Sequence, residues 1–275
     1  MPDCNHDCSS CGENCSERVI EKISTNEDSH IKHVIGVVSG KGGVGKSFVT
    51  SLLASELNKQ GYKVGILDGD ITGPSIPKSF NITKHAEGDG VRYIYPAVTK
   101  TNIKIISSNM LLDKTDDPII WRGSLISSLL LQFFKDVLWE ELDYLLIDMP
   151  PGTGDVTLTA FQQLPLDGIV VVTSPQDLVN MIVGKAVNMA KMMNIPVLGI
   201  VENMSYVKCP TCNEKIYLYG ESKIDEIATK YDLKVLAKLP ILVGNSKVID
   251  NGEIEKLHYE EFDNAVEEVK KLWLK

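Results

Sequence analysis

The sequence predicts an α/β fold, a doubly wound and mainly parallel sheet with helices on both faces. From residue 33 onward, short runs of β-branched residues alternate with stretches of helical periodicity, which is typical of βαβ units. The runs are continuously apolar, as expected of strands that are buried on both faces. Loops rich in Gly, Asp or Pro follow the runs, and the first of them is a dense glycine and lysine motif.

The expected strands and helices follow this alternation. The strands are HVIGVVS (33–39), KVGILD (63–68), IKIISS (103–108), YLLID (144–148), GIVVVTS (168–174), PVLGIVEN (196–203) and VLAKLP (235–240). The helices cover about 46–60, 122–141, 180–194, 222–231 and 257–273. Ligands of such sheets bind at the C-terminal ends of the strands, so we expect the site in the loops that follow these runs.

Chain length and cysteine placement divide the chain into two parts. Its 275 residues suffice for one large α/β domain with a small appendage. Residues 1–30 are polar and carry four of the six cysteines, so we interpret them as a metal- or cluster-binding segment and linker. Residues 31–275 form the expected main domain and carry the other two cysteines, Cys209 and Cys212.

Charge and hydropathy exclude several classes of protein. The formal net charge of −9 argues against nucleic-acid binding, which needs a positive surface. The sequence shows neither a secretory signal nor an apolar stretch of about 18 residues, so we expect a cytoplasmic protein without a membrane segment. Thiols stay reduced in that compartment, and we therefore interpret the cysteines as metal ligands or redox groups before disulfides.

The loop after the first expected strand fits the phosphate-binding pattern G-x-x-x-x-G-K-[ST]. Its glycines let backbone N–H groups approach phosphates, and the start of the next helix adds positive potential. Lys46 would reach the terminal phosphates of ATP, and the Ser47 hydroxyl would ligate Mg²⁺. The motif consists of Gly40, Lys41, Gly42, Gly43, Val44, Gly45, Lys46 and Ser47.

Acidic residues at two other strand ends complete the predicted site. Asp148 ends YLLID, where a carboxylate supports the Mg²⁺ shell, and the glycines of the following loop at 152–154 are placed to sense the γ-phosphate. Asp68 and Asp70 follow another strand, and one would order metal-bound water while the other orders the attacking water. A lone aspartate at a strand end is usually turn chemistry, but two such loops facing one phosphate loop favour a functional site.

Cys209 and Cys212 form a CxxC after the expected strand 196–203. Two thiolates are half of a tetrahedral four-sulfur site, which the same pair from a second subunit would complete. A redox pair and half of a zinc knuckle are the alternatives. The N-terminal set is different, because CxxxCxxCxxxC can close a four-sulfur site in one chain and suits either zinc or a [4Fe–4S] cluster. It consists of Cys4, Cys8, Cys11 and Cys15.

Taken together, these residues resemble the Mrp/ApbC/Nbp family of iron–sulfur carrier ATPases, which are P-loop NTPases of the MinD-like type. The resemblance covers about residues 33–255 and rests on VVSGKGGVGKS, GILDGDITGPSIP, PIIWRGSLI, DYLLIDMPPGTGD, VVVTSPQD and VENMSYVKCPTC. The last two segments discriminate best, since NMSY followed by CPxC is similar to this family alone, whereas the phosphate loop indicates only an NTPase.

The resemblance implies roles for individual residues. The lysine at position 41 looks like the deviant Walker A lysine that reaches the nucleotide across a dimer interface, which implies an ATP-dependent homodimer. Cys209 and Cys212 would ligate a [4Fe–4S] cluster that bridges the dimer. Asn203 would contact the adenine, and Asp70 is similar to the water-positioning aspartate. Asp68 and Asp148 would support Mg²⁺. The expected catalytic residues are Lys41, Lys46 and Asp70.

The implied function is to bind an iron–sulfur cluster and transfer it to apoprotein clients, with ATP binding and slow hydrolysis as the switch. One alternative is a positioning or regulatory ATPase of the MinD or ParA kind with structural zinc. Its membrane form needs a basic amphipathic C-terminal helix, but the polar side of the expected helix 257–273 is acidic, so we expect that helix to pack on its own domain. An electron-transfer reductase is disfavoured by the CPxC spacing.

Overall fold

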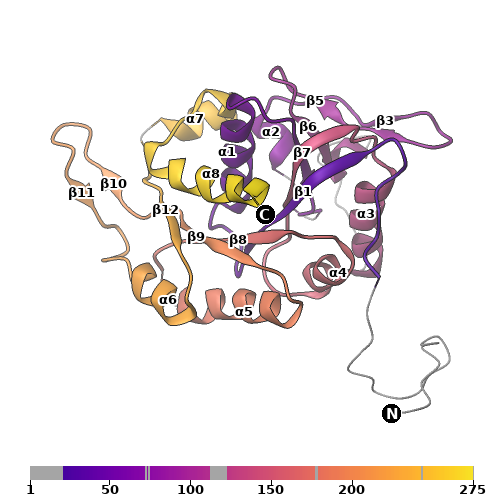
Figure 1. The fold of residues 1–275 in the computed structure, drawn as a ribbon. Coiled ribbons are helices and arrows are strands. Elements are labelled where there is room, and N and C mark those ends of the chain that lie inside the picture. The colour runs from indigo at the N-terminus through magenta and orange to yellow at the C-terminus, as the bar shows by residue number, and fades with distance from the viewer. Residues whose placement is uncertain are drawn as a thin grey trace, which may run out of the picture.

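The fold was analysed on a computed structural model, which describes residues 21–71, 73, 75–111, 123–176, 179–242 and 244–274 (Figure 1). A sheet of eight described strands forms its middle layer, in the order β12-β9-β8-β1-β7-β2-β6-β5. All neighbours in it pair in parallel except β5, which is antiparallel to β6. The strands are β1 (His30–Ser39), β2 (Val64–Asp68), β5 (Ala97–Val98), β6 (Lys104–Ser107), β7 (Glu141–Asp148), β8 (Gly168–Thr173), β9 (Val197–Glu202) and β12 (Val235–Lys238).

Helices cover both faces of the sheet and make three layers (Figure 1). One face is covered by α3 (Gly123–Asp136), α4 (Asp155–Gln163), α5 (Val179–Met192) and α6 (Ile224–Tyr231). The other face carries α1 (Lys46–Lys59), α2 (Ile76–Ser79) and α8 (Asp263–Lys270), with α7 (Asn245–Asp250) beside α2. This is the predicted doubly wound α/β fold.

The apolar runs are buried on both faces, as the sequence predicts. In β1, Val34 and Val38 belong to the core under α3–α6, whereas Ile35 and Val37 belong to the core under α1 and α8. Successive side chains of a strand point to opposite faces, so a central strand between two helix layers needs apolar residues at every position. Burial on both faces of the sheet thus explains why the apolar runs are continuous.

Smaller elements complete the described chain. Two short antiparallel hairpins stand outside the main sheet, β3 (Glu87–Gly88) with β4 (Ile94–Tyr95) and β10 (Val207–Lys208) with β11 (Lys215–Ile216). Figure 1 shows the β10–β11 hairpin projecting from the body at the end of the sheet that carries β9 and β12. The 3₁₀ turns are η1 (Ser108–Leu111), η2 (Ile254–Lys256), η3 (Glu260–Phe262) and η4 (Lys271–Leu274).

Two expected helices differ from the structure, and the structure has a helix, α4, that was not expected. The helix expected over 122–141 ends at Asp136, because Trp139 turns into the core and donates its backbone N–H to Ser29 Oγ at 2.9 Å and its indole N–H to the Phe133 carbonyl at 3.3 Å. The sequence analysis did not identify α4, which starts directly after a Pro- and Gly-rich loop. The expected C-terminal helix is divided into η3, α8 and η4.

The C-terminal segment packs on its own domain, as predicted. Val266 and Val269 of α8 are buried in the core that also contains α1. Within the described residues, no helix is both long and apolar enough to cross a membrane.

The N-terminal cysteines and Trp121 lie outside the described residues. Residues just before β1 already contact the main domain, since Lys22 Nζ donates to the Phe161 carbonyl at 2.7 Å and Asn26 Nδ2 donates to the Lys135 carbonyl at 2.9 Å. The boundary near residue 30 stays a prediction.

Candidate nucleotide and metal-binding site

The phosphate loop connects β1 to α1, as the motif requires. Gly43 and Gly45 have φ of 79° and 80°, in the left-handed region that favours glycine. The loop lines a cleft of about 360 Å³ at the C-terminal edge of the sheet. The lining residues are Ser39, Lys41, Gly42, Gly43, Val44, Gly45, Lys46, Ser47, Phe48, Asp70, Gly73, Ser75, Ser79, Pro151 and Ile249.

Lys46 is buried at the floor of this cleft, with 5% of its side chain exposed. Its Nζ lies 2.8 Å from Asp148 Oδ2 and 3.9 Å from Asp70 Oδ2. The ammonium is thus paired with the Asp148 carboxylate at the floor of the cleft. A buried cation at the start of a helix and beside a glycine-rich loop fits a phosphate.

Asp148 is the centre of a hydrogen-bond network at the end of β7. It is fully buried, and it accepts from Ser47 Oγ at 2.6 Å and from Thr50 Oγ1 at 2.8 Å. The β2–β7 register pairs it with Asp68. The carboxylate and the serine hydroxyl are hard oxygen donors of the kind that Mg²⁺ prefers, so this pair fits a magnesium site.

Asp68 is fully buried next to Asp148. Burial and, second, the Asp148 carboxylate raise its pKa to about 8, while the Lys46 ammonium and a hydrogen bond from Ser107 Oγ at 3.1 Å act in the opposite direction. At neutral pH Asp68 therefore keeps its proton in this arrangement. A divalent cation beside Asp68 would favour its ionised form.

Asp70 and Lys41 lie at the open side of the cleft. Asp70 is partly exposed, and its Oδ2 lies 3.9 Å from Lys46 Nζ. Lys41 is half-buried, and its Nζ donates to Gln176 Oε1, in the loop after β8. The structure therefore places both predicted catalytic residues at the cleft, while Lys41 is held by a side chain of its own chain.

Asn203 packs directly on the phosphate loop. Its Nδ2 donates to the Val44 carbonyl at 3.0 Å, and it lies 2.2 Å from the position that a Cβ on Gly45 would occupy. The space of the missing side chain at Gly45 is thus filled by the Asn203 amide. This contact connects the end of β9 to the nucleotide cleft.

Cys209 and Cys212 occupy the turn of the β10–β11 hairpin. The turn is closed by Cys209 N–H donating to the Glu214 carbonyl and by Asn213 N–H donating to the Cys209 carbonyl, both at 2.9 Å. Both thiols are free, and Cys212 is exposed. Backbone N–H groups of Cys212 and Thr211 point at the Cys209 sulfur and lower the pKa of its thiol. The turn is therefore prepared to present thiolates.

Within the described residues, no third ligand accompanies the two cysteines. Among the described residues, no group of three or more His, Cys, Asp or Glu side chains is arranged to bind a metal ion. The hairpin thus supplies two sulfur ligands on a surface projection, separate from the cleft.

The fold and the cleft together define a P-loop NTPase. Within this class, residues 30–273 match the ParA family model that is described as "NUBPL iron-transfer P-loop NTPase". The chain belongs to this family, in agreement with the resemblance found in the sequence.

Individual relatives agree with this assignment. The chain is 48% identical over 259 residues to the iron-sulfur cluster carrier protein of Clostridium perfringens, covering 90% of each chain. It is 42% identical over 260 residues to the protein of the same name from Methanocaldococcus jannaschii, covering 92% of this chain and 90% of that one.

Solved structures show the same architecture. A nucleotide-binding protein from Archaeoglobus fulgidus in complex with ADP superposes with a TM-score of 0.75 at 44% identity, covering 85% of this chain and 91% of that chain. The cell division ATPase MinD of Pyrococcus furiosus has a TM-score of 0.61 at 20% identity, covering 88% of this chain and 99% of that chain, and shows the fold alone.

Sequence reasoning missed two side chains at the cleft. Thr50 lies one helical turn after Lys46 on α1, and this spacing on the P-loop helix was the available signal. Gln176 stands in the SPQD segment, but its contact with Lys41 depends on the adjacency of β1 and β8, which the sequence does not give directly.

Proposed function

We propose that this protein binds an iron–sulfur cluster at Cys209 and Cys212 and transfers it to apoprotein clients, with ATP binding and slow hydrolysis as the switch. The observation that carries the proposal is the hairpin turn, which presents two free thiols at the surface with backbone N–H groups directed at one sulfur. Relatives that are 40–48% identical over most of the chain are named iron-sulfur cluster carrier proteins, which supports it.

The cluster is shared between two copies of the chain. One hairpin supplies only two thiolates, whereas a [4Fe–4S] cluster takes four. In a two-fold dimer, the same pair from the partner completes the set. Surface exposure of the turn and its projection from the body suit a ligand that has to be reached by a client (Figure 1).

ATP binds in the cleft with Mg²⁺. Lys46 and the loop N–H groups bind the phosphates, Ser47 and Asp148 hold Mg²⁺ with Asp68 in support, and Asn203 is adjacent for adenine contact. Asp70 positions the attacking water. Lys41 leaves Gln176 and reaches the nucleotide of the partner when the dimer forms. Hydrolysis is slow, because the described cleft offers neither an arginine nor a histidine.

The proposal also covers the parts that the structure leaves undescribed. Cys4, Cys8, Cys11 and Cys15 would bind a second cluster or zinc.

The protein acts in the cytoplasm as a homodimer, without nucleic-acid or membrane partners. The net charge of −9 supports the absence of nucleic acid.

The test is the iron, sulfide and zinc content per chain after anaerobic reconstitution, with Cys209→Ala/Cys212→Ala as the comparison. About two irons per chain, lost in the double variant, are expected from one four-iron cluster per dimer. Iron that persists in the variant would assign a second cluster to the N-terminal cysteines. Zinc without iron or sulfide uptake would contradict the carrier function and favour the structural-zinc alternative.

A further inference from the structure

Glu202 is a buried carboxylate that the nucleotide and cysteine sites do not use. It ends β9, and 1% of it is exposed. Its two carboxylate oxygens accept from two hydroxyls: Oε2 from Ser205 Oγ at 2.6 Å and Oε1 from Ser222 Oγ at 2.7 Å. Among the described residues no cation forms an ion pair with it. Burial of a carboxylate costs free energy that two neutral donors offset only in part, so stability alone does not explain this residue.

The two serines bracket the cysteine hairpin. Ser205 stands two residues before β10, and Ser222 follows β11 by six residues. One carboxylate therefore ties both ends of the segment that presents the thiols to the end of β9. Ser222 also accepts from the Ile224 N–H at 3.2 Å, which connects the same hydroxyl to the start of α6.

The residue after Glu202 is the one that packs on the phosphate loop. Asn203 donates to the Val44 carbonyl, and the terminal carbon of Met204 lies 3.8 Å from the Cβ position of Gly45. The turn 202–205 thus touches the phosphate loop through its middle and the hairpin through its ends. Asn203 and Glu202 are adjacent in the chain, so a displacement of the Asn203 backbone acts on the residue that holds both serines.

Backbone strain indicates that contacts hold this turn in place. Met204 has φ of 58°, in the left-handed region that a residue with a side chain seldom adopts. The amide of Asn203 and the carboxylate of Glu202 fix its two neighbours. Loss of either contact would allow the turn to relax.

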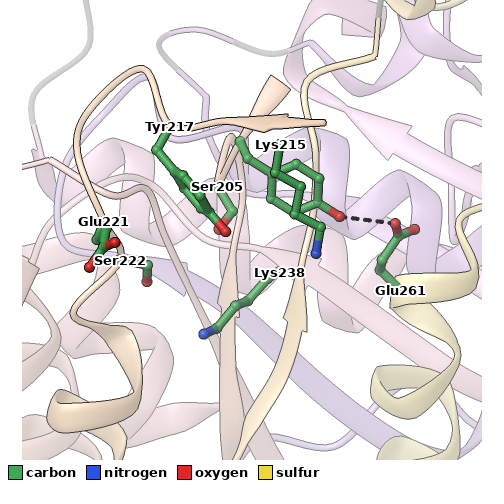
Figure 2. A pocket seen from close by; sticks show the side chains of 8 residues that line it. Ser205, Lys215, Tyr217, Glu221, Ser222, Lys238 and Glu261 are labelled. Atoms are coloured by element: carbon green, nitrogen blue, oxygen red, sulfur yellow. Dashed lines mark hydrogen bonds between the residues drawn. The ribbon is translucent and has the colours of Figure 1, made fainter. Parts of the chain in front are cut away.

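The hairpin has room to move. A pocket of about 400 Å³ lies between it and the body, with Lys215 and Tyr217 on the hairpin side and Lys238 and Glu261 on the body side (Figure 2). Ser205 and Ser222 lie at this pocket, as Figure 2 shows. A second hydrogen bond crosses the pocket, from Tyr206 Oη to Glu261 Oε1 at 3.1 Å, and it involves neither Glu202 nor Asn203.

We propose that Glu202 is the positioning residue that couples occupancy of the nucleotide cleft to the conformation of the cysteine hairpin, through Asn203 on one side and Ser205 and Ser222 on the other. The biological role of this coupling, control of cluster transfer, rests on the proposed function. Its physical content is independent of any cluster: nucleotide in the cleft changes the accessibility of Cys209 and Cys212.

The experiment measures alkylation of Cys209 and Cys212 in the metal-free full-length chain by N-ethylmaleimide, with and without Mg·ADP or Mg·ATPγS. Trypsin cleaves after Lys208 and Lys215, so mass spectrometry of the peptide CPTCNEK separates these thiols from the N-terminal ones. Because coupling between sites typically amounts to a factor of about 5–150, nucleotide should change the wild-type alkylation rate by at least about fivefold.

Ser222→Ala should reduce that nucleotide effect to less than about twofold, with nucleotide still bound. Glu202→Gln is the second variant and should reduce it in the same direction. Ser222→Thr keeps the hydroxyl and should retain the effect. Tyr206→Phe is the matched control, because it removes a hydrogen bond between the base of the hairpin and the body that involves neither Glu202 nor Asn203. A merely structural role would raise the rate equally with and without nucleotide and leave the ratio unchanged.

Three results would overturn the proposal: a wild-type rate that nucleotide does not change, an unchanged ratio in Ser222→Ala, or an equal loss of the ratio in Tyr206→Phe. Iron uptake by the wild type is assayed in parallel. A chain that takes up no iron but retains the nucleotide effect would refute the carrier function and leave the coupling intact. A chain that takes up iron but shows no nucleotide effect would refute the coupling and leave the carrier function intact.

Discussion

Substitution of alanine at Gly45 isolates the contact between the phosphate loop and Asn203. Gly43 and Gly45 share the same backbone conformation, with φ of 79° and 80°. Their surroundings differ, because a Cβ at Gly43 meets no atom within 4 Å whereas a Cβ at Gly45 would lie 2.2 Å from Asn203 Nδ2. Gly43→Ala is therefore a matched control for the backbone penalty.

The magnitudes follow from these contacts. An L-residue in the left-handed region costs about 1–2 kcal/mol, which applies to both variants. Gly45→Ala must also displace the Asn203 amide and break its hydrogen bond to Val44, at a further cost of about 0.5–1.5 kcal/mol. We expect a loss of about 1–2 kcal/mol for Gly43→Ala and about 1.5–3.5 kcal/mol for Gly45→Ala in the free energy of unfolding.

The assay is urea unfolding of the nucleotide-free protein, extended to a double-mutant cycle with Asn203→Ala. In the Asn203→Ala background the steric conflict is gone, so Gly45→Ala should cost no more than Gly43→Ala, and the coupling energy should be about 1 kcal/mol. Equal losses for the two glycine variants in the wild-type background would refute the inferred packing of Asn203 on the loop.

Three further predictions concern the cleft. Asp68→Asn should remove a pH dependence of the free energy of unfolding, measured by urea titration in EDTA. The pKa of Asp68 is raised to about 8, chiefly by burial, so between about pH 4 and 8 the folded state keeps a proton that the unfolded state releases. The wild-type free energy of unfolding should therefore fall as pH rises through that window. Parallel pH profiles of the two proteins would contradict this. Thr50→Val should cost about 1–3 kcal/mol in the same assay, because it leaves an oxygen of the buried Asp148 without its donor. Thr50→Ser keeps the hydroxyl and should be near wild type. Equal losses in the two variants would show that the hydrogen bond is not the cause. Lys46→Ala should abolish nucleotide binding in calorimetry and leave iron uptake at the hairpin largely unchanged, and loss of both would contradict separate sites.

Much of the cleft was predictable because its parts lie in short motifs at strand ends. The phosphate loop carries its own geometry in two left-handed glycines, and the parallel sheet brings Asp68 and Asp148 into register at one edge. The sequence alone could therefore place Lys46 among these carboxylates. The protonation state of Asp68 was not predictable from the sequence, because its raised pKa depends on complete burial beside Asp148.

Other features depend on contacts between distant segments. The hairpin strands β10 and β11 have two residues each, too few for an alternation pattern to be read. Glu202 stands at the end of an apolar run like any turn residue, and its two serine partners become visible only when residues 205 and 222 meet in the fold. The helix expected to reach residue 141 was wrong beyond Asp136, since burial of Trp139 overrides helical propensity there.

The fold that this chain shares with MinD does not by itself imply a shared function. The C-terminal helix α8 buries its apolar face in the domain, and the cysteines stand on a hairpin outside the main sheet. The function therefore has to be tested at the hairpin.

Native mass spectrometry of the anaerobically reconstituted protein tests the central claim most directly. The account predicts a dimer that carries one four-iron, four-sulfide cluster at the hairpins, and loss of that mass in Cys209→Ala/Cys212→Ala, because each hairpin supplies only two of the four thiolates. A monomer that keeps a complete cluster on Cys209 and Cys212, or a dimer that carries zinc in its place, would contradict it.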